Sequence, residues 1–280
     1  MATRNSALIN RLPRRRDAKT DNNAIFEAGL DGLKEQLTSM GGKAELAVDL
    51  AVQCYLTREV RLCSELPSIE TQLSECERSI DEIAIQLHSH QALNNSNLRP
   101  LAGYMKISTN LKHIGETALQ IGDRILSDYQ PRILFPENIQ AIGTAASEMI
   151  HRAVNALCEA DGDTADAVLD MSDIVKRISD ETWVYLVAEI RESPQSSPSA
   201  LNALLVTRNL EQVAGYAANM ARDILFWVCG ADPELRVVPQ IGGRSLAHVS
   251  FLTGDVARRR TLGVRAGHMG PAGAENHVNV

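Results

Sequence analysis

The sequence contains few aromatic residues, which limits the kind of core that it can build. Aromatics make up 4% of the 280 residues, whereas hydrophobic residues as a whole reach 44%. The core must therefore consist mainly of Leu, Ile, Val and Ala, which suit helix-on-helix packing better than a β-sandwich. We accordingly expect an all-α protein.

The sequence also lacks a long apolar segment. No hydrophobic run approaches the roughly 18 residues that a membrane-spanning helix requires. The N-terminus has no uninterrupted hydrophobic stretch of the kind that forms the centre of a signal peptide. We therefore expect a cytoplasmic protein without a transmembrane segment.

Cysteine is scarce and irregularly spaced. No Cys-x-x-Cys pair occurs, and most of the five cysteines lie in apolar periodic segments. They are Cys54, Cys63, Cys76, Cys158 and Cys229. We expect reduced thiols in the core, in keeping with a reducing compartment.

Positive charge is in deficit, because the formal net charge of the whole chain is −7. A nucleic-acid-binding protein needs a basic surface, so we expect no direct nucleic-acid binding. Arginines nevertheless gather near both ends of the chain. We expect residues 1–21 to form a disordered basic arm and residues 233–280 a mostly disordered tail.

One stretch of sequence occurs twice, displaced by 99 positions, at residues 110–126 and 209–225. Both copies place apolar residues at positions i, i+3, i+7, i+10 and i+14. They are Leu111, Ile114, Ala118, Ile121 and Ile125 in the first copy, and Leu210, Val213, Ala217, Met220 and Ile224 in the second. This spacing predicts one buried stripe on an α-helix, so a helical unit is duplicated.

Apolar periodicity and turn residues predict three helices in each copy. Their approximate ranges are residues 26–66, 67–87, 98–126, 139–157, 168–190 and 199–229. The first is one long or broken helix, in which Gly41-Gly42 indicates a bend. The segment 129–132 contains a proline and is expected to link the two units. We therefore predict two tandem three-helix bundles, at residues 22–129 and 133–232, with flexible termini.

Several motifs, in order and at the right spacing, resemble the PhoU family of phosphate transport regulators. Met40-Gly41 resembles Met-Gly in the family's first helix, and Asn97-Leu98-Arg99 resembles Asp-Leu-Arg at the start of its third. Residues 111–116 and 208–221 resemble its third-helix run Arg-x-Leu-Glu-Arg-Ile-Gly-Asp-His, and residues 223–228 the end of its sixth helix. The resemblance covers about residues 24–232.

This resemblance implies a cytoplasmic helical protein, commonly a homodimer, that represses the phosphate-starvation response when phosphate is plentiful. It implies contacts with a sensor histidine kinase and with the ATPase subunit of the phosphate ABC transporter. We also find no predicted strand that could carry a nucleophile, and so expect no enzyme. Two alternatives stay open: a helical metal-binding or storage protein, and a PhoU-like scaffold unrelated to phosphate.

The chain departs from the family at the metal motif. In the family, a glutamate and an aspartate four residues apart on each third helix can bridge iron or another cation. Here Lys112 replaces the glutamate of the first copy and Gly215 the aspartate of the second, which leaves Glu116 and Glu211. An ammonium about 4 Å from a cation repels it by about 4 kcal/mol at an effective dielectric near 20.

The candidate metal ligands are therefore Glu116 and Glu211, with Asp81 and Asp180 of the second helices as possible additions. We expect iron or another divalent metal to bind weakly or not at all, and no cofactor. An alternative is that Lys112 and Glu116 form only a solvated i,i+4 ion pair. The segment Glu148-Met149-Ile150-His151 spells Glu-x-x-His, but a di-iron site in a helical bundle needs two such motifs.

Overall fold

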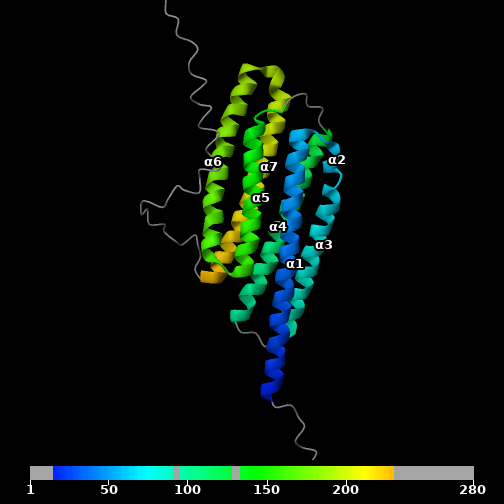
Figure 1. Ribbon diagram of the computed structural model, residues 1–280, viewed down its shortest axis with the longest axis vertical. Coiled ribbons are helices and arrows are strands. Elements are labelled where there is room, and N and C mark those ends of the chain that lie inside the picture. Colours follow the sequence, from blue (N-terminus) through cyan, green and yellow to red (C-terminus); the bar gives the residue numbers. More distant parts are fainter. Residues whose placement is uncertain (1–14, 91–94, 128–132, 230–280) are drawn as a thin grey trace, which may run out of the picture. The chain divides into compact units, whose positions relative to one another are not determined.

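The computed structural model describes residues 15–90, 95–127 and 133–229, and every element within these ranges is a helix. The elements, drawn in Figure 1, are α1 (Arg15–Thr57), α2 (Val60–Cys63), α3 (Leu66–His90), α4 (Asn95–Ser127), α5 (Pro136–Glu159), α6 (Gly162–Glu192), the 3₁₀ turn η2 (Pro194–Ser196) and α7 (Ser197–Cys229). The predicted all-α class is confirmed. None of these helices combines the length and the apolar composition that crossing a membrane would require.

Two predicted boundaries differ from the structure. Helix α1 begins at Arg15, inside the arm that was expected to be disordered as far as residue 21. Arg, Ala and Lys are good helix formers, so they extend a helix that packing has already stabilised further along. Helix α4 begins at Asn95, three residues before the predicted start at residue 98. The predicted link at 129–132, residues 1–14 and the tail at 233–280 lie outside the described residues.

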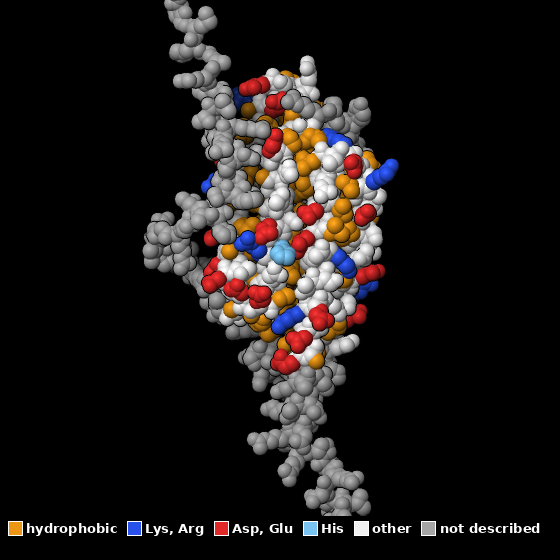
Figure 2. All heavy atoms as spheres, viewed as in Figure 1, with side chains coloured by type: hydrophobic (Ala, Val, Ile, Leu, Met, Phe, Trp, Pro, Cys, Tyr) orange, Lys and Arg blue, Asp and Glu red, His pale blue; other side chains and the backbone are white. Residues whose placement is uncertain are grey.

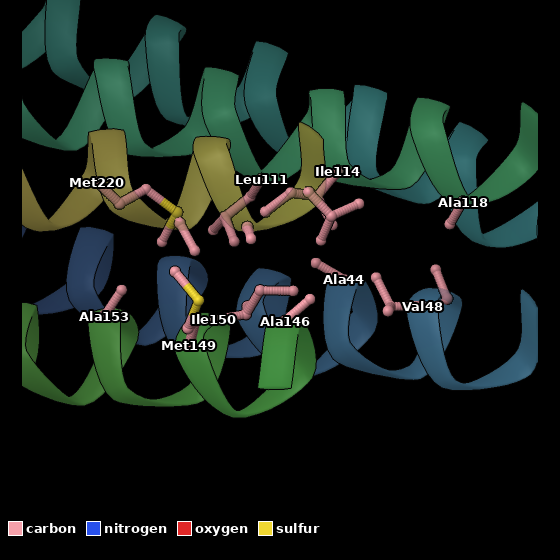
Figure 3. Close-up of a cluster of buried hydrophobic side chains, with 14 of the residues drawn as sticks. Ala44, Val48, Leu111, Ile114, Ala118, Ala146, Met149, Ile150, Ala153 and Met220 are labelled. Carbon is pink, nitrogen blue, oxygen red and sulfur yellow. The ribbon is translucent and has the colours of Figure 1, made fainter. Parts of the chain in front are cut away.

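The helices of the two units share one hydrophobic core. Helices α3, α4, α7 and α6 lie side by side in that order. Helices α1 and α5 pack against each other; α1 also contacts α3 and α4, and α5 also contacts α6 and α7. The side chains between α1, α4, α5 and α7 meet at the centre (Figure 3). Those labelled there are Ala44, Val48, Leu111, Ile114, Ala118, Ala146, Met149, Ile150, Ala153 and Met220.

The repeated stripe lies where its spacing predicts. All ten of its residues on α4 and α7 are buried in this core. An i, i+3, i+7 pattern brings side chains onto one side of a helix. The third helix of the first unit, α4, packs against α1, and that of the second unit, α7, packs against α5. The prediction of a duplicated helical unit is therefore confirmed at the level of its core.

Gly41 and Gly42 do not end α1, which continues through both residues. A Cβ atom added at Gly41 would lie 2.7 Å from Cγ2 of Val154 on α5, whereas one added at Gly42 would meet nothing within 4 Å. On the other side of the same contact, a Cβ at Gly143 of α5 would lie 2.6 Å from Cγ2 of Val52 on α1. Gly41 and Gly143 therefore allow α1 and α5 to approach closely. This close contact accounts for the glycine at position 41 without the bend that was expected there.

The expectation of reduced thiols is wrong for one pair of cysteines. Cys54 at the end of α1 and Cys63 in α2 form a disulfide, with 6.1 Å between their Cα atoms. Arg58, just after α1, has a φ of 62°, a left-handed conformation that redirects the chain and brings the two cysteines together. Cys76 and Cys158 are free thiols, and the side chain of Cys229 lies outside the described residues.

The surface carries both signs of charge. On the face drawn in Figure 2, acidic and basic side chains are scattered among one another, and hydrophobic side chains reach the surface between them. Several large hydrophobic residues in the described part of the chain are exposed, and α6 and the start of α7 contribute a group of them. This group consists of Trp183, Val184, Tyr185, Val187, Leu201 and Leu205.

Candidate functional site

The first candidate site, which we call the first groove, lies at the contact between α3 and α4, where Lys112 links the two helices. Its Nζ atom is 3.2 Å from Oε2 of Glu77 on α3 and 3.7 Å from Oε1 of Glu116, one turn along α4. The second carboxylate oxygen of Glu77 accepts a hydrogen bond of 2.9 Å from Oγ1 of Thr109. The ammonium therefore lies between two carboxylates, and the predicted i,i+4 ion pair is the longer of its two contacts.

The electrostatics place Asp81 in the same group. The hydrogen bond that Lys112 donates to the carboxylate of Glu77 is the main reason that the pKa of Lys112 is raised, so its ammonium is held in the charged form. The pKa of Asp81 is also raised, first by burial and then by the charge of Glu77, with Lys112 acting in the opposite direction. Glu116 and Asp81, which the sequence singled out, thus both interact with the same ammonium.

Glu77 was not recognised from the sequence. It lies four residues before Asp81, on the same face of α3, so an i,i+4 search starting from Asp81 would have found it. Glu77 belongs to the site only because Lys112 of α4 supplies the positive charge with which its carboxylate pairs. The local pattern of α3 alone does not reveal that partner.

Glu116 is also tied to the seam between the two units. Its Oε2 atom lies 2.9 Å from Nδ1 of His113, and the imidazole of His113 stacks on the ring of Tyr216 of α7 at a centroid distance of 5.4 Å. The amide Nε2 of Gln212 donates a 2.7 Å hydrogen bond to the hydroxyl oxygen of Tyr216. The two oxygens of Glu116 therefore both have partners on α4, and the ring pair joins α4 to α7.

The second candidate site lies between α6 and α7 and is arranged differently. Asp180 of α6 and Glu211 of α7 line a cavity of about 260 Å³. Its other lining residues are Ser179, Trp183, Leu186, Leu204, Thr207 and Arg208. The only ion pair of Glu211 within the described residues is loose, with 3.9 Å between its Oε2 atom and Nη1 of Arg208. At Gly215 an added Cβ would meet nothing within 4 Å, so the missing side chain leaves open space.

The structure thus brings the four candidate ligands together in two pairs, Asp81 with Glu116 and Asp180 with Glu211. In the described part of the chain no group of three or more His, Cys, Asp or Glu residues is placed to hold a metal ion. An ammonium shares the first groove, and a guanidinium shares the second. This donor set does not fit the carboxylate-bridged cation that the family motif implies. The assignment of the four residues as metal ligands stays a prediction.

The members of the Glu-x-x-His segment have separate partners. Oε1 of Glu148 lies 2.6 Å from Nε of Arg152, while Nδ1 of His151 lies 3.4 Å from Oε1 of Glu45 on α1. The pKa of Glu45 is raised, mainly because the carboxyl group is partly buried, although the nearby His151 acts in the opposite direction. The segment therefore contributes contacts between α1 and α5.

Comparison with known proteins identifies relatives that match both units. A family model described as "PhoU domain" matches residues 37–125 and 139–224. A Pseudomonas aeruginosa protein named "Phosphate-specific transport system accessory protein PhoU homolog" is 26% identical over 211 residues, which cover 74% of this chain and 86% of the relative. The Escherichia coli K12 protein named "Phosphate-specific transport system accessory protein PhoU" is 22% identical, with the same coverage of both chains.

Solved structures agree with this result. The crystal structure of PhoU from Pseudomonas aeruginosa matches with a TM-score of 0.70 at 26% sequence identity, and covers 74% of this chain and 100% of that chain. The phosphate transport system regulatory protein PhoU from Streptococcus pneumoniae matches with a TM-score of 0.69 at 14% identity, a likeness that shows the fold alone. The arrangement of helices described above is therefore shared with solved proteins of this type.

Proposed function

Since this chain belongs to the PhoU family, we propose that it is a negative regulator of phosphate uptake and phosphate-starvation signalling. Its relatives are named as accessory proteins of the phosphate-specific transport system. The observation that carries the proposal is the match of the family model to both helical units, in the order and spacing of the repeat. Its partners in this proposal are a sensor histidine kinase and the ATPase subunit of the phosphate ABC transporter.

Action by protein contact, without catalysis, fits the surface of the second unit. Trp183, Val184 and Leu201 are large hydrophobic residues that are more than one-third exposed. Large exposed apolar side chains on neighbouring helices are candidates for a protein interaction surface. They lie on helices that pack firmly against the shared core, so such a surface would be presented on a rigid body.

The regulator in this proposal works without a resident metal in the first groove. Lys112 already supplies a positive charge next to Glu77 and Glu116, at 3.2 and 3.7 Å. A divalent cation in the same place would have to displace that ammonium or tolerate its repulsion. The charge that a metal would provide between α3 and α4 is thus part of the chain itself.

We place the protein in the cytoplasm, where its proposed partners present their soluble parts. The disulfide between Cys54 and Cys63 is unusual for a reducing compartment. Cys54 and Cys63 are, however, both buried in the core. Thiol exchange requires access of an attacking thiolate to one of the sulfur atoms, so burial protects the bond from soluble reductants.

Deletion of the gene tests the proposed role directly. A reporter under phosphate-starvation control should be switched on in high phosphate in the deletion strain, and the full-length gene should silence it again. A reporter that stays silent without the gene would contradict the role. Purification of the tagged protein from cells grown in high phosphate then tests the partners, because the kinase and the transporter ATPase are distinguishable by mass spectrometry.

A further inference from the structure

The cavity between α6 and α7 has polar walls whose partners are incomplete. Ser179 is only 3% exposed, and its Oγ atom is buried without a hydrogen-bond partner. Asp180 and Glu211 add two carboxylates to the lining, and Trp183 adds an aromatic side chain that is 51% exposed. Buried polar atoms normally have partners, so the unpaired hydroxyl of a residue that lines a cavity calls for an explanation, and a ligand in the cavity would supply one.

These lining residues match the chemistry of an organic cation. Carboxylates accept charge-assisted hydrogen bonds from ammonium and guanidinium groups. An indole face attracts the same groups through its quadrupole, more strongly than other aromatic rings. The aliphatic chain of such a cation would contact two leucines, the buried Leu186 and the partly buried Leu204.

The first unit shows the same type of groove with its cation built in. There the ammonium of Lys112 lies between α3 and α4, against Glu77 at 3.2 Å. In the second unit Glu211 takes the position of Lys112, 99 residues later, and Lys176 takes that of Glu77. Within the described residues Lys176 forms no ion pair with Glu211, whose contact with Arg208 measures 3.9 Å. The acids of the second site therefore have only the loose contact between Arg208 and Glu211 in place of the closer ion pair that Lys112 forms in the first unit.

Other ligand classes fit the cavity less well. Two carboxylates and a neighbouring guanidinium are a poor set for a divalent metal, and no group of three metal-binding side chains occurs among the described residues. An anion would face a lining with two carboxylates against one guanidinium. The volume of about 260 Å³ lies just below the usual range of about 300–1,000 Å³ for drug-sized ligands, so a single side chain or a small molecule would fill it.

We propose that the α6–α7 cavity binds an alkylammonium or alkylguanidinium group, with Asp180 and Glu211 as its anionic partners and Trp183 as its aromatic wall. The source is either a free small cation or a lysine or arginine side chain of another protein. This site is separate from the regulatory role proposed above, because binding to it is measured on the purified chain without kinase or transporter.

Trp183 supplies the reporter for a test. The chain has two tryptophans, so Trp227→Phe leaves Trp183 as the single tryptophan, which can be excited selectively at the long wavelengths where tyrosine absorbs little. Butylguanidinium chloride is then titrated against it, with butylurea as the neutral control of the same shape. We expect a saturable change in Trp183 fluorescence with the cation and none with the urea. Responses of equal size to both compounds, or no saturable response to the cation, would overturn the proposal.

Matched variants separate the site from general surface charge. In the Trp227→Phe protein, Asp180→Asn and Glu211→Gln should each weaken cation binding about tenfold, the usual effect of losing one charge-assisted hydrogen bond. Glu181→Gln changes the net charge equally at a neighbouring residue that does not line the cavity, and should leave the affinity unchanged. Equal losses in Asp180→Asn and Glu181→Gln would refute the assignment.

Two further measurements sharpen the result. Ser179→Ala should weaken binding of butylguanidinium while raising the melting temperature of the free protein, because it removes an unpaired buried hydroxyl. A purely structural serine would not change the affinity, and that outcome would remove it from the site. A short peptide with one arginine distinguishes the sources: tighter binding than butylguanidinium assigns the cavity to a protein side chain, and equal binding assigns it to a free cation.

Discussion

The contact between α1 and α5 predicts opposite effects for the same mutation at two adjacent residues. In Gly41→Ala the new methyl group would lie 2.7 Å from Cγ2 of Val154 and 3.3 Å from its Cγ1. Ordinary contacts between carbon atoms measure about 3.5–4.0 Å, and a valine in a helix has one strongly preferred χ1 rotamer. The valine therefore cannot turn away, and the two helices must separate slightly.

The size of the effect follows from two opposing contributions. Overpacking a well-filled core costs about 1–3 kcal/mol, while replacing glycine by alanine inside a helix gains about 1 kcal/mol. Gly41→Ala should therefore lower the free energy of unfolding by about 1 kcal/mol. Gly42→Ala gains the helix preference alone, because nothing lies within 4 Å of its Cβ position, and should raise it by about 1 kcal/mol.

Urea unfolding followed by circular dichroism measures both variants against the wild type. The difference of about 2 kcal/mol between them corresponds to about 4–8 °C in melting temperature for a domain of this size. An equal slope with urea concentration in all three proteins would show that only stability has changed. If Gly41→Ala proves as stable as Gly42→Ala, the close approach of α1 and α5 through Gly41 is refuted.

The remaining predictions concern the disulfide, the first groove and pH. Under denaturing conditions Ellman's reagent should count three free thiols and not five, and a count of five in the untreated protein would contradict the disulfide. The double mutant Cys54→Ala/Cys63→Ala should lower the free energy of unfolding by about 2.5 kcal/mol, because the bond closes a loop with a sequence separation of 9. Lys112→Gln removes the ammonium and should bind divalent metal about a thousandfold more tightly than the wild type, as measured by elemental analysis after dialysis. Lys112→Glu also restores the carboxylate of the family motif and should bind more tightly still, and equal metal content in all three proteins would contradict the role of the ammonium. The pKa of Glu45 is raised by burial above its ordinary value of 4.5, so the folded state binds this proton more tightly, and the stability that it contributes below pH 4.5 is lost as pH rises through the raised pKa. Glu45→Gln should therefore flatten the fall in unfolding free energy as the pH rises above 4.5 through the raised pKa of Glu45, and an unchanged pH profile would show that Glu45 is not responsible.

The parts of the fold that depend on local periodicity could be predicted from the sequence. The stripe that includes Leu111 and Leu210 repeats along one helix, so its burial follows from spacing alone. The close contact at Gly41 could not be predicted, because its partner Val154 lies on another helix and far along the chain. The disulfide was missed because it depends on the left-handed turn at Arg58, which no spacing of cysteines reveals.

The candidate site was predictable only in part for the same reason. The sequence identified Glu116 and Asp81 as acids at helical positions, and the structure places both near Lys112. It did not identify Glu77, Ser179 or Trp183, because their role depends on which residue faces them across a groove. Contacts between helices decide the chemistry here, and a single sequence contains them only indirectly.

The shared core gives the chain the character of a dimer fused into one polypeptide. Each three-helix unit covers apolar side chains of the other through α1 with α5 and α4 with α7. A single unit with this stripe would have to pair with a copy of itself, and then both grooves would be identical by symmetry. Fusion removes that constraint. In the first unit Lys112 lies between α3 and α4 against Glu77, whereas in the second unit a cavity remains between α6 and α7. The duplication thus gave this protein two grooves that were free to specialise separately.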